Sequence, residues 1–336
     1  METQEQKDLI KNAIEQAKLN GILKYLPNGE LTHAPFSLSP YAMPESVFEK
    51  MAELTVPFNE LMIKVSRNTD FLIHHLEPIA AIDPFLKMLL KCRSKEINQN
   101  CQLLIQRNDF FIANVKHNDY KQNTTPTNEI TEESVLRQVE LNTVSASFPF
   151  LITRLYQLHK NLFEQNKLPK VIQNNPLDAV VDAFAHSVQN YGISDSVILV
   201  VVQSNEKNIF DQIGLQQHLW IKHNIATVRK TLAEIHKDGK LRQGHLVVDG
   251  KTVALTYFRA GYTPDDFPEE QAFKGRQLIE ASSTIQVPDM GMQLSGMKKI
   301  QQVLTKKEVL ADFVTEEILR SFLKTFAKMH TLDEII

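Results

Sequence analysis

The sequence is poor in glycine, and this excludes one class of nucleotide site from much of the chain. Only 11 of the 336 residues are glycine, and none lies between Gly29 and Gly192. A loop that cradles phosphate needs glycines so that the backbone can approach the ligand closely. Gly291 and Gly296 have the spacing of such a loop, but the lysine comes one position late, at Lys298. That segment is therefore not a P-loop.

Cysteine and long apolar runs are also scarce. Cys92 and Cys101 are too few for a disulfide framework and lack partners at zinc spacing, which predicts free buried thiols. The most apolar run, residues 197–202, has the length of a strand and is too short to cross a bilayer. Because the N-terminus is polar and acidic rather than basic and then apolar, no secretory signal is predicted and a cytoplasmic protein is expected.

The charges are nearly balanced, which disfavours polyanionic partners. The 37 Lys and Arg residues almost match the 40 Asp and Glu residues, so neither nucleic acid nor an anionic membrane is an expected partner. With 43% hydrophobic residues, a chain of this length can bury a core and form about two domains. The adjacent His74 and His75 could bind a metal, but a half-exposed pair on a helix is the favoured interpretation.

Periodicity predicts helices in the first third and mixed elements after it. A break at Pro57 is expected to start a helix that carries an apolar stripe. The elements predicted next are short strands at 103–105 and 110–112, a polar loop at 117–133, a strand at 135–142, and a helix through Leu151, Leu155 and Leu158.

The second half alternates strands and helices. The β-branched run at 197–202 predicts a strand buried on both faces of a parallel sheet, with another strand near 226–228. Asp249-Gly250 predicts a hairpin turn. The expected helices are one with Ile209, Phe210, Ile213 and Trp220 on one face, followed by helices at 297–304 and 318–326.

These patterns predict an α/β fold in three parts. Residues 1–193 form a helical and mixed region with a strand for metal and substrate. Residues 194–288 form an inserted, parallel-sheet substrate-binding domain, and residues 289–336 form a helical return segment.

Two short segments that follow predicted strands carry anion-binding chemistry. The turn at 203–208 precedes a helix, whose N-terminus suits an anionic ligand. An equally good interpretation is that Asn205 or Asn208 only caps that helix. Arg259, Gly261 and Tyr262 combine a planar cationic fork, a tight turn and a hydroxyl donor. A surface arginine in a turn is the alternative.

A third segment carries oxygen ligands. Glu140 and Asn142 alternate on a strand, so both side chains face the same side and could bind Mg²⁺. The serines at 145 and 147 could hold a carboxylate. An ordinary polar strand end explains the same pattern, and periodicity alone favours it. Lys298, at a helix start, could hold phosphate or simply be solvated.

In their order along the chain, these segments resemble the eukaryotic-type glutathione synthetases, which are ATP-grasp ligases. The matching motifs are HAPFSL at 33–38, VELNTVSAS at 139–147, NIFDQ at 208–212, YFRAGY at 257–262 and QLSGMKKIQQ at 293–302. The resemblance implies ligation of γ-glutamylcysteine and glycine through an acyl phosphate, with ATP as substrate and Mg²⁺ as cofactor, in a homodimer.

The resemblance also assigns roles to individual residues. It implies that Glu140 and Asn142 bind Mg²⁺, and that Glu140 and Lys298 contact ATP. It assigns substrate binding to Arg107, Val144, Ser145, Ala146, Ser147, Glu206, Lys207, Asn208, Gln212, Arg259, Ala260, Gly261 and Tyr262.

Three departures qualify the resemblance. The loop at 117–133 is longer than expected, and Ala260 stands where many relatives have Asp. The sequence is also expected to stop before the family's C-terminal nucleotide-binding part, with its glycine-rich loop. The alternatives are therefore one portion of a split ligase, joined by a separate C-terminal half, or a non-catalytic γ-glutamyl peptide-binding module.

Overall fold

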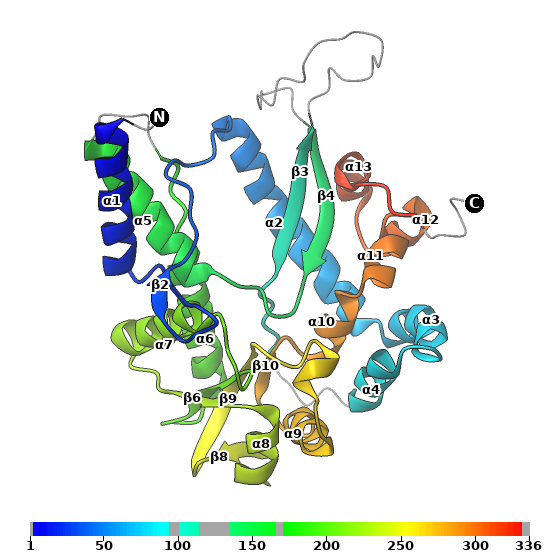
Figure 1. The fold of residues 1–336 in the computed structure, drawn as a ribbon. Coiled ribbons are helices and arrows are strands. Elements are labelled where there is room, and N and C mark those ends of the chain that lie inside the picture. The colour runs from blue at the N-terminus through cyan, green and yellow to red at the C-terminus, as the bar shows by residue number, and fades with distance from the viewer. Residues whose placement is uncertain (1–2, 94–100, 114–134, 166–170, 331–336) are drawn as a thin grey trace.

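The computed structural model describes residues 3–93, 101–113, 135–165 and 171–330, which form a mixed α/β fold (Figure 1). Its main sheet has the strand order β6-β5-β9-β8-β7, and β10 pairs with β9. The strands are β5 (Val197–Val201), β6 (Thr227–Lys230), β7 (Gly239–Arg242), β8 (His245–Val248), β9 (Lys251–Phe258) and β10 (Ile285–Val287).

This sheet is mixed, whereas a parallel-sheet domain with one hairpin was expected. β5, β6, β9 and β10 are parallel, but β8 pairs antiparallel with both β7 and β9. The cause is the predicted hairpin: Asp249 and Gly250 have φ values of 51° and 78°, which turn the chain straight back from β8 into β9.

Helices cover both faces of the sheet. All five residues of β5 are buried, as predicted. Ile198 and Val200 face one apolar cluster and Leu199 and Val201 face another, because successive strand side chains point to opposite faces. The helices that supply these clusters are α5 (Pro149–Gln165), α6 (Pro176–Tyr191) and α7 (Ile209–His223) on one side, and α8 (Leu232–Asp238) and α9 (Glu270–Glu280) on the other.

The apolar face predicted for α7 is not the face that packs against the sheet. Ile213 and Trp220 are 45% and 54% exposed, whereas Leu215 and Leu219 are buried against the sheet. Gly214 lies on the buried side, where an added Cβ would come within 2.3 Å of the Phe150 ring. The absence of a side chain at this position lets α7 pack closely against α5, which an apolar count cannot reveal.

A second core joins the N-terminal helices to the last ones. It gathers α2 (Glu45–Arg67), α3 (Thr69–Ala80), α4 (Pro84–Cys92), α10 (Met290–Ser295), α11 (Lys298–Leu304), α12 (Lys307–Leu310) and α13 (Glu316–Thr325). The predicted break at Pro57 is wrong, because α2 continues through it. Leu54 and Phe58, on either side of Pro57, are both buried, so packing outweighs the hydrogen bond that proline removes.

A two-stranded antiparallel ribbon, β3 (Arg107–Ala113) and β4 (Val135–Asn142), stands between α2 and α13 (Figure 1). The strands predicted at 110–112 and 135–142 are confirmed, and the loop predicted at 117–133 lies outside the described residues. Residues 103–105 form no strand. Leu103 and Ile105 instead pack into the sheet cluster and Leu104 into the helical core, so this segment joins the two cores.

The N-terminal segment packs on α5. It consists of α1 (Gln4–Leu19) and a small hairpin of β1 (Leu23–Tyr25) and β2 (Leu31–His33). Ala13 and Ala17 of α1 are buried beside Leu158 and Leu162 of α5. No helix in the described part of the chain combines the length and apolarity needed to span a membrane.

Candidate functional site

The three segments singled out in the sequence lie at strand ends in the structure: two follow β5 and β9, and the third begins with the last residues of β4. β5 and β9 are parallel neighbours in which Val201 lies beside Phe258, so their carboxyl ends meet at one edge. The N–H of Arg259 donates to the carbonyl of Val201 at 2.8 Å and extends this pairing. Open α/β sheets bind ligands at such an edge.

The segment after β4 is held against this edge by Arg259. Arg259 is 4% exposed, and its guanidinium donates from Nη1 to the Ala146 carbonyl at 2.9 Å and from Nη2 to Ser147 Oγ at 2.6 Å. The Tyr257 hydroxyl also donates to the Ala146 carbonyl, at 3.2 Å. Arg259 is therefore not the surface arginine of the alternative interpretation. It joins the end of β9 to the segment after β4.

Sequence reasoning missed Asp211, a buried carboxylate of α7 that also fixes the segment after β4. It accepts the N–H groups of Phe148, Phe150 and Leu151 at 2.9–3.1 Å and so caps α5. Burial raises the pKa of Asp211, and these three hydrogen bonds oppose that rise. Ser145 and Phe148 both have positive φ, at 53° and 75°, so the tight backbone path around the serines needs this anchor. In the sequence Asp211 stands within the motif NIFDQ at 208–212, but no local pattern links it to residue 148.

The segment after β9 is held by a second carboxylate. Asp266 Oδ2 accepts the N–H groups of Gly261, Tyr262 and Thr263 at 2.9–3.2 Å. Gln293 of α10 donates to the Gly261 carbonyl at 2.8 Å. Gly261 has a φ of 97°, which favours glycine and explains the tight turn predicted there.

The turn after β5 presents Asn208 at the N-cap of α7. The Asn208 side chain makes no capping bond, and its own N–H is accepted by Glu206 Oε1 at 2.8 Å. The simple capping interpretation of this residue is therefore wrong. Gln212 lies one turn further along α7 and is buried, with its Oε1 accepting from Arg229 Nη2 of β6 at 2.9 Å.

The polar side chains of the β3–β4 ribbon form a compact group. Arg107 lies opposite Asn142, and Asp109 opposite Glu140. Arg107 binds Asp109 through Nε at 2.8 Å and Nη2 at 2.9 Å, and Glu140 forms an ion pair with Lys298 of α11 at 2.7 Å. The hydrogen bonds that Arg107 donates to Asp109 raise the pKa of Arg107, and the negative charges of Asp109 and Glu140 raise it further, whereas burial lowers it.

These segments enclose a cavity of about 470 Å³. Its lining contains ten of the predicted residues: Arg107, Asn142, Val144, Ser145, Ser147, Glu206, Lys207, Asn208, Arg259 and Tyr262. Phe148 and Gln203, which were not predicted, complete it. Three cations and one carboxylate make the lining favourable for an anionic ligand.

The remaining predicted residues lie around the cavity rather than in its lining. Ala146, Gln212, Ala260 and Gly261 are buried and are absent from the lining. Glu140 is on the ribbon with Arg107 and Asn142, which line the cavity, and Lys298 of α11 is bound to Glu140.

The glycine pair at 291 and 296 serves packing, in agreement with its exclusion as a P-loop. A Cβ on Gly291 would lie 2.5 Å from the Ser66 carbonyl oxygen, and one on Gly296 would lie 2.3 Å from Thr143 Oγ1. Gly296 thus lets the start of α11, with Lys298, approach the end of β4.

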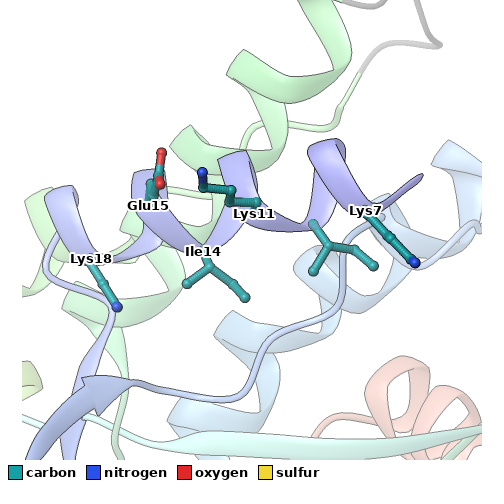
Figure 2. Close-up of a pocket in the computed structure, with 6 residues that line it drawn as sticks. Lys7, Lys11, Ile14, Glu15 and Lys18 are labelled. Atoms are coloured by element: carbon teal, nitrogen blue, oxygen red, sulfur yellow. The ribbon is translucent and has the colours of Figure 1, made fainter. Parts of the chain in front are cut away.

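Other candidate groups lie away from this cavity. Both thiols are free, as predicted. Cys92 is buried, as also predicted, but Cys101 is only half-buried. His74 and His75 lie side by side on α3, and the described residues contain no group of three or more His, Cys, Asp or Glu side chains placed to hold a metal. A shallow hollow on α1, lined by Lys7, Ile10, Lys11, Ile14, Glu15 and Lys18, involves one helix only (Figure 2).

With this geometry in place, comparison with known proteins identifies the family. A sequence model described as the ATP-binding domain of eukaryotic glutathione synthase matches residues 3–335. The chain belongs to the eukaryotic glutathione synthase family. It is 37% identical to the chloroplastic glutathione synthetase of Solanum lycopersicum over 92% of this chain and 56% of that protein. It is 33% identical to the glutathione synthetase of Dictyostelium discoideum over 97% of this chain and 68% of that protein.

A solved structure shares the fold of this glutathione synthase family member. It is a glutathione synthetase-like effector from Globodera pallida, with a TM-score of 0.78 and 19% identity, covering 98% of this chain and 72% of that one. The chain thus spans between about half and three quarters of the length of these relatives.

Proposed function

We propose that this chain acts as a glutathione synthetase, an ATP-dependent ligase that joins γ-glutamylcysteine to glycine with release of ADP and phosphate. The observation that carries the proposal is the cavity at the carboxyl ends of β5 and β9. The segment after β4 forms part of its wall and is held there by Arg259. The family supports the reaction, and the arrangement of charges supports the substrate.

The charges of the cavity suit a peptide with two carboxylates. Arg107, Lys207 and Arg259 supply cations, and Glu206 supplies one carboxylate that can receive an ammonium group. γ-Glutamylcysteine carries two carboxylates and one ammonium, so its charges complement this lining. Ser145, Ser147 and Asn208 add hydroxyl and amide groups that can orient the peptide backbone.

The ribbon beside the cavity has the chemistry to receive a metal nucleotide. The carboxylate oxygens of Glu140 and the amide oxygen of Asn142 are hard ligands of the kind that Mg²⁺ takes, with water and phosphate oxygens completing its shell. We assign Mg²⁺ binding to Glu140 and Asn142, and contact with ATP to Glu140 and Lys298. When bound, Mg²⁺ would neutralise phosphate charge during transfer.

The residues of this chain would act mainly by positioning. Arg107 and Arg259 would hold substrate carboxylates, and the segment around Ser145 and Ser147 would fix the peptide so that its reacting carboxylate points toward the ribbon. Phosphoryl transfer to that carboxylate gives an acyl phosphate, which the amine of glycine then attacks. The contribution of this chain to the reaction would be to hold Mg²⁺ on the ribbon next to the peptide in the cavity.

The test combines binding with turnover. Purified chain should bind γ-glutamylcysteine in calorimetry without ATP, and should form ADP and glutathione when ATP, Mg²⁺ and glycine are added. Absence of turnover, even with a C-terminal fragment from a relative supplied in trans, would refute the ligase proposal. Binding without turnover would favour the peptide-binding module. A homodimer, also proposed from the family, would be tested by sedimentation.

A further inference from the structure

Asp109 is the one carboxylate of the ribbon to which the assignments above give no substrate role. It lies two residues after Arg107 on β3, so both side chains share a face of the ribbon. In the strand register it stands directly opposite Glu140. Arg107 lines the cavity and Asp109 does not.

The bond between Asp109 and Arg107 is bidentate. Asp109 Oδ1 accepts from Arg107 Nε at 2.8 Å and Oδ2 accepts from Nη2 at 2.9 Å, which fixes the plane of the guanidinium. Nη1 takes no part in this bond. The Arg107 side chain is 47% exposed, so without this clamp few other contacts would restrain it.

Glu140 is the competing partner for Arg107. The two residues lie on the same face of the ribbon, and the charge of Glu140 contributes to the raised pKa of Arg107. The Asn142 amide lies among them: its nitrogen is 3.3 Å from Asp109 Oδ2 in one orientation. In the reversed orientation the amide nitrogen donates to Glu140 Oε1 at 3.2 Å and the amide oxygen accepts from Arg107 Nη2 at 3.0 Å. This orientation gives a hydrogen-bond partner to both the nitrogen and the oxygen of Asn142.

We propose that Asp109 is a positioning residue, which clamps Arg107 so that its guanidinium serves the substrate cavity instead of pairing with Glu140 across the ribbon. Two opposing effects follow from its removal. Loss of a negative charge beside Arg107 would strengthen binding of a carboxylate, whereas capture of the guanidinium by Glu140 would weaken it. Glu140 is the diagonal neighbour of Arg107 in the strand register, within reach of a long side chain, so capture is expected to be the larger effect.

The inference rests on the proposed function, and binding of γ-glutamylcysteine to the full chain tests it by calorimetry. Asp109→Asn keeps the shape of the side chain and removes its charge, and should weaken binding about tenfold. Asp109→Glu keeps the charge but displaces the carboxylate, and should give an intermediate loss. Asp312→Asn, an exposed aspartate in the last third of the chain, is the matched control and should leave binding unchanged.

A double-mutant cycle separates clamping from a general structural role. In an Arg107→Gln background, Asp109→Asn should change binding by no more than about twofold, because nothing remains to be clamped. Melting temperatures of all variants should agree within about 2 °C, since the Asp109 side chain is 32% exposed.

The outcomes distinguish the two proposals. If the unmodified chain does not bind the dipeptide, the proposed function fails and the clamp fails with it. If the unmodified chain binds, and Asp109→Asn binds equally or more tightly, the clamp alone is overturned. An undiminished effect of Asp109→Asn in the Arg107→Gln background would also overturn it.

Discussion

The guanidinium of Arg259 donates to the hydroxyl of Ser147 at 2.6 Å, joining two segments 112 residues apart in the sequence. Its second nitrogen binds the adjacent Ala146 carbonyl, and the whole side chain is buried. The residue expected to recognise substrate therefore also builds the cavity wall that would present Ser145 and Ser147.

Replacing Arg259 with lysine should impair binding and stability together. A single ammonium cannot reach both the Ala146 carbonyl and Ser147 Oγ with the geometry of a planar fork. We expect γ-glutamylcysteine to bind about tenfold more weakly and the free energy of unfolding to fall by about 1–3 kcal/mol. Calorimetry and urea denaturation measure the two effects. Unchanged binding in Arg259→Lys would contradict the role of the fork.

Asp211→Asn should destabilise the start of α5. One carboxylate oxygen accepts from Phe150 and Leu151 and the other from Phe148, so an amide nitrogen in the second position would face an N–H donor. We expect a loss of about 1–3 kcal/mol, the cost of an unsatisfied buried donor. Urea denaturation at neutral pH measures it, and a loss below 0.5 kcal/mol, on the order of an ordinary surface change, would contradict the capping role.

The titration of Asp211 should also give stability a specific pH dependence. Its pKa is raised in the folded state, so between about pH 4, where the unfolded residue titrates, and the folded pKa, the folded chain binds more protons than the unfolded chain. Its contribution to stability is therefore greatest below pH 4 and decreases as pH rises through this window. The stability difference between the unmodified chain and Asp211→Asn should shrink accordingly, and a difference that grows with pH would contradict the assigned shift.

The two thiols should react at different rates. Burial raises the pKa of Cys92 to about 12, so almost none of it is thiolate at pH 8. Cys101 is half-buried and more accessible. Iodoacetamide on the folded chain should modify Cys101 first, with Cys92 modified only in denaturant, as read by peptide mass spectrometry. A Cys101→Ser variant should then remain unlabelled under native conditions, and rapid labelling of Cys92 would contradict its burial.

Gly296→Ala should disturb the contact between α11 and β4. The added Cβ would lie 2.3 Å from Thr143 Oγ1, so the chain must shift and stability should fall by about 1–3 kcal/mol. The next nearest atom, Thr143 Cβ, lies at 3.4 Å, so adding Thr143→Ala should make the cost of Gly296→Ala smaller. Thermal denaturation of the single and double variants measures this coupling. Simple additivity would argue against the contact.

Strong local patterns predicted most elements correctly. The continuous run at 197–201 forms a fully buried strand, and Asp249-Gly250 forms the expected hairpin. Local reasoning failed where distant packing decides the outcome. Pro57 does not break α2 because residues of α13 and β3 pack against the neighbouring Phe58. The centroid of the Phe58 ring lies 4.2 Å from that of Phe322 and 6.4 Å from that of Phe110. Residues 103–105 have strand-like composition but lie between two cores, and no strand in the described part of the chain pairs with them.

The sequence by itself determined the family, the strand ends and the residue types of the site, because these depend on short motifs and on alternation along the chain. The scarcity of glycine before residue 192 likewise located any phosphate loop elsewhere. Only the tertiary structure decided which of these residues meet. Asp211 shows this most directly, because the N–H groups that it accepts, those of Phe148, Phe150 and Leu151, belong to a segment about 60 residues earlier in the chain. Hydrogen bonds between distant segments depend on position in space, which no local pattern records.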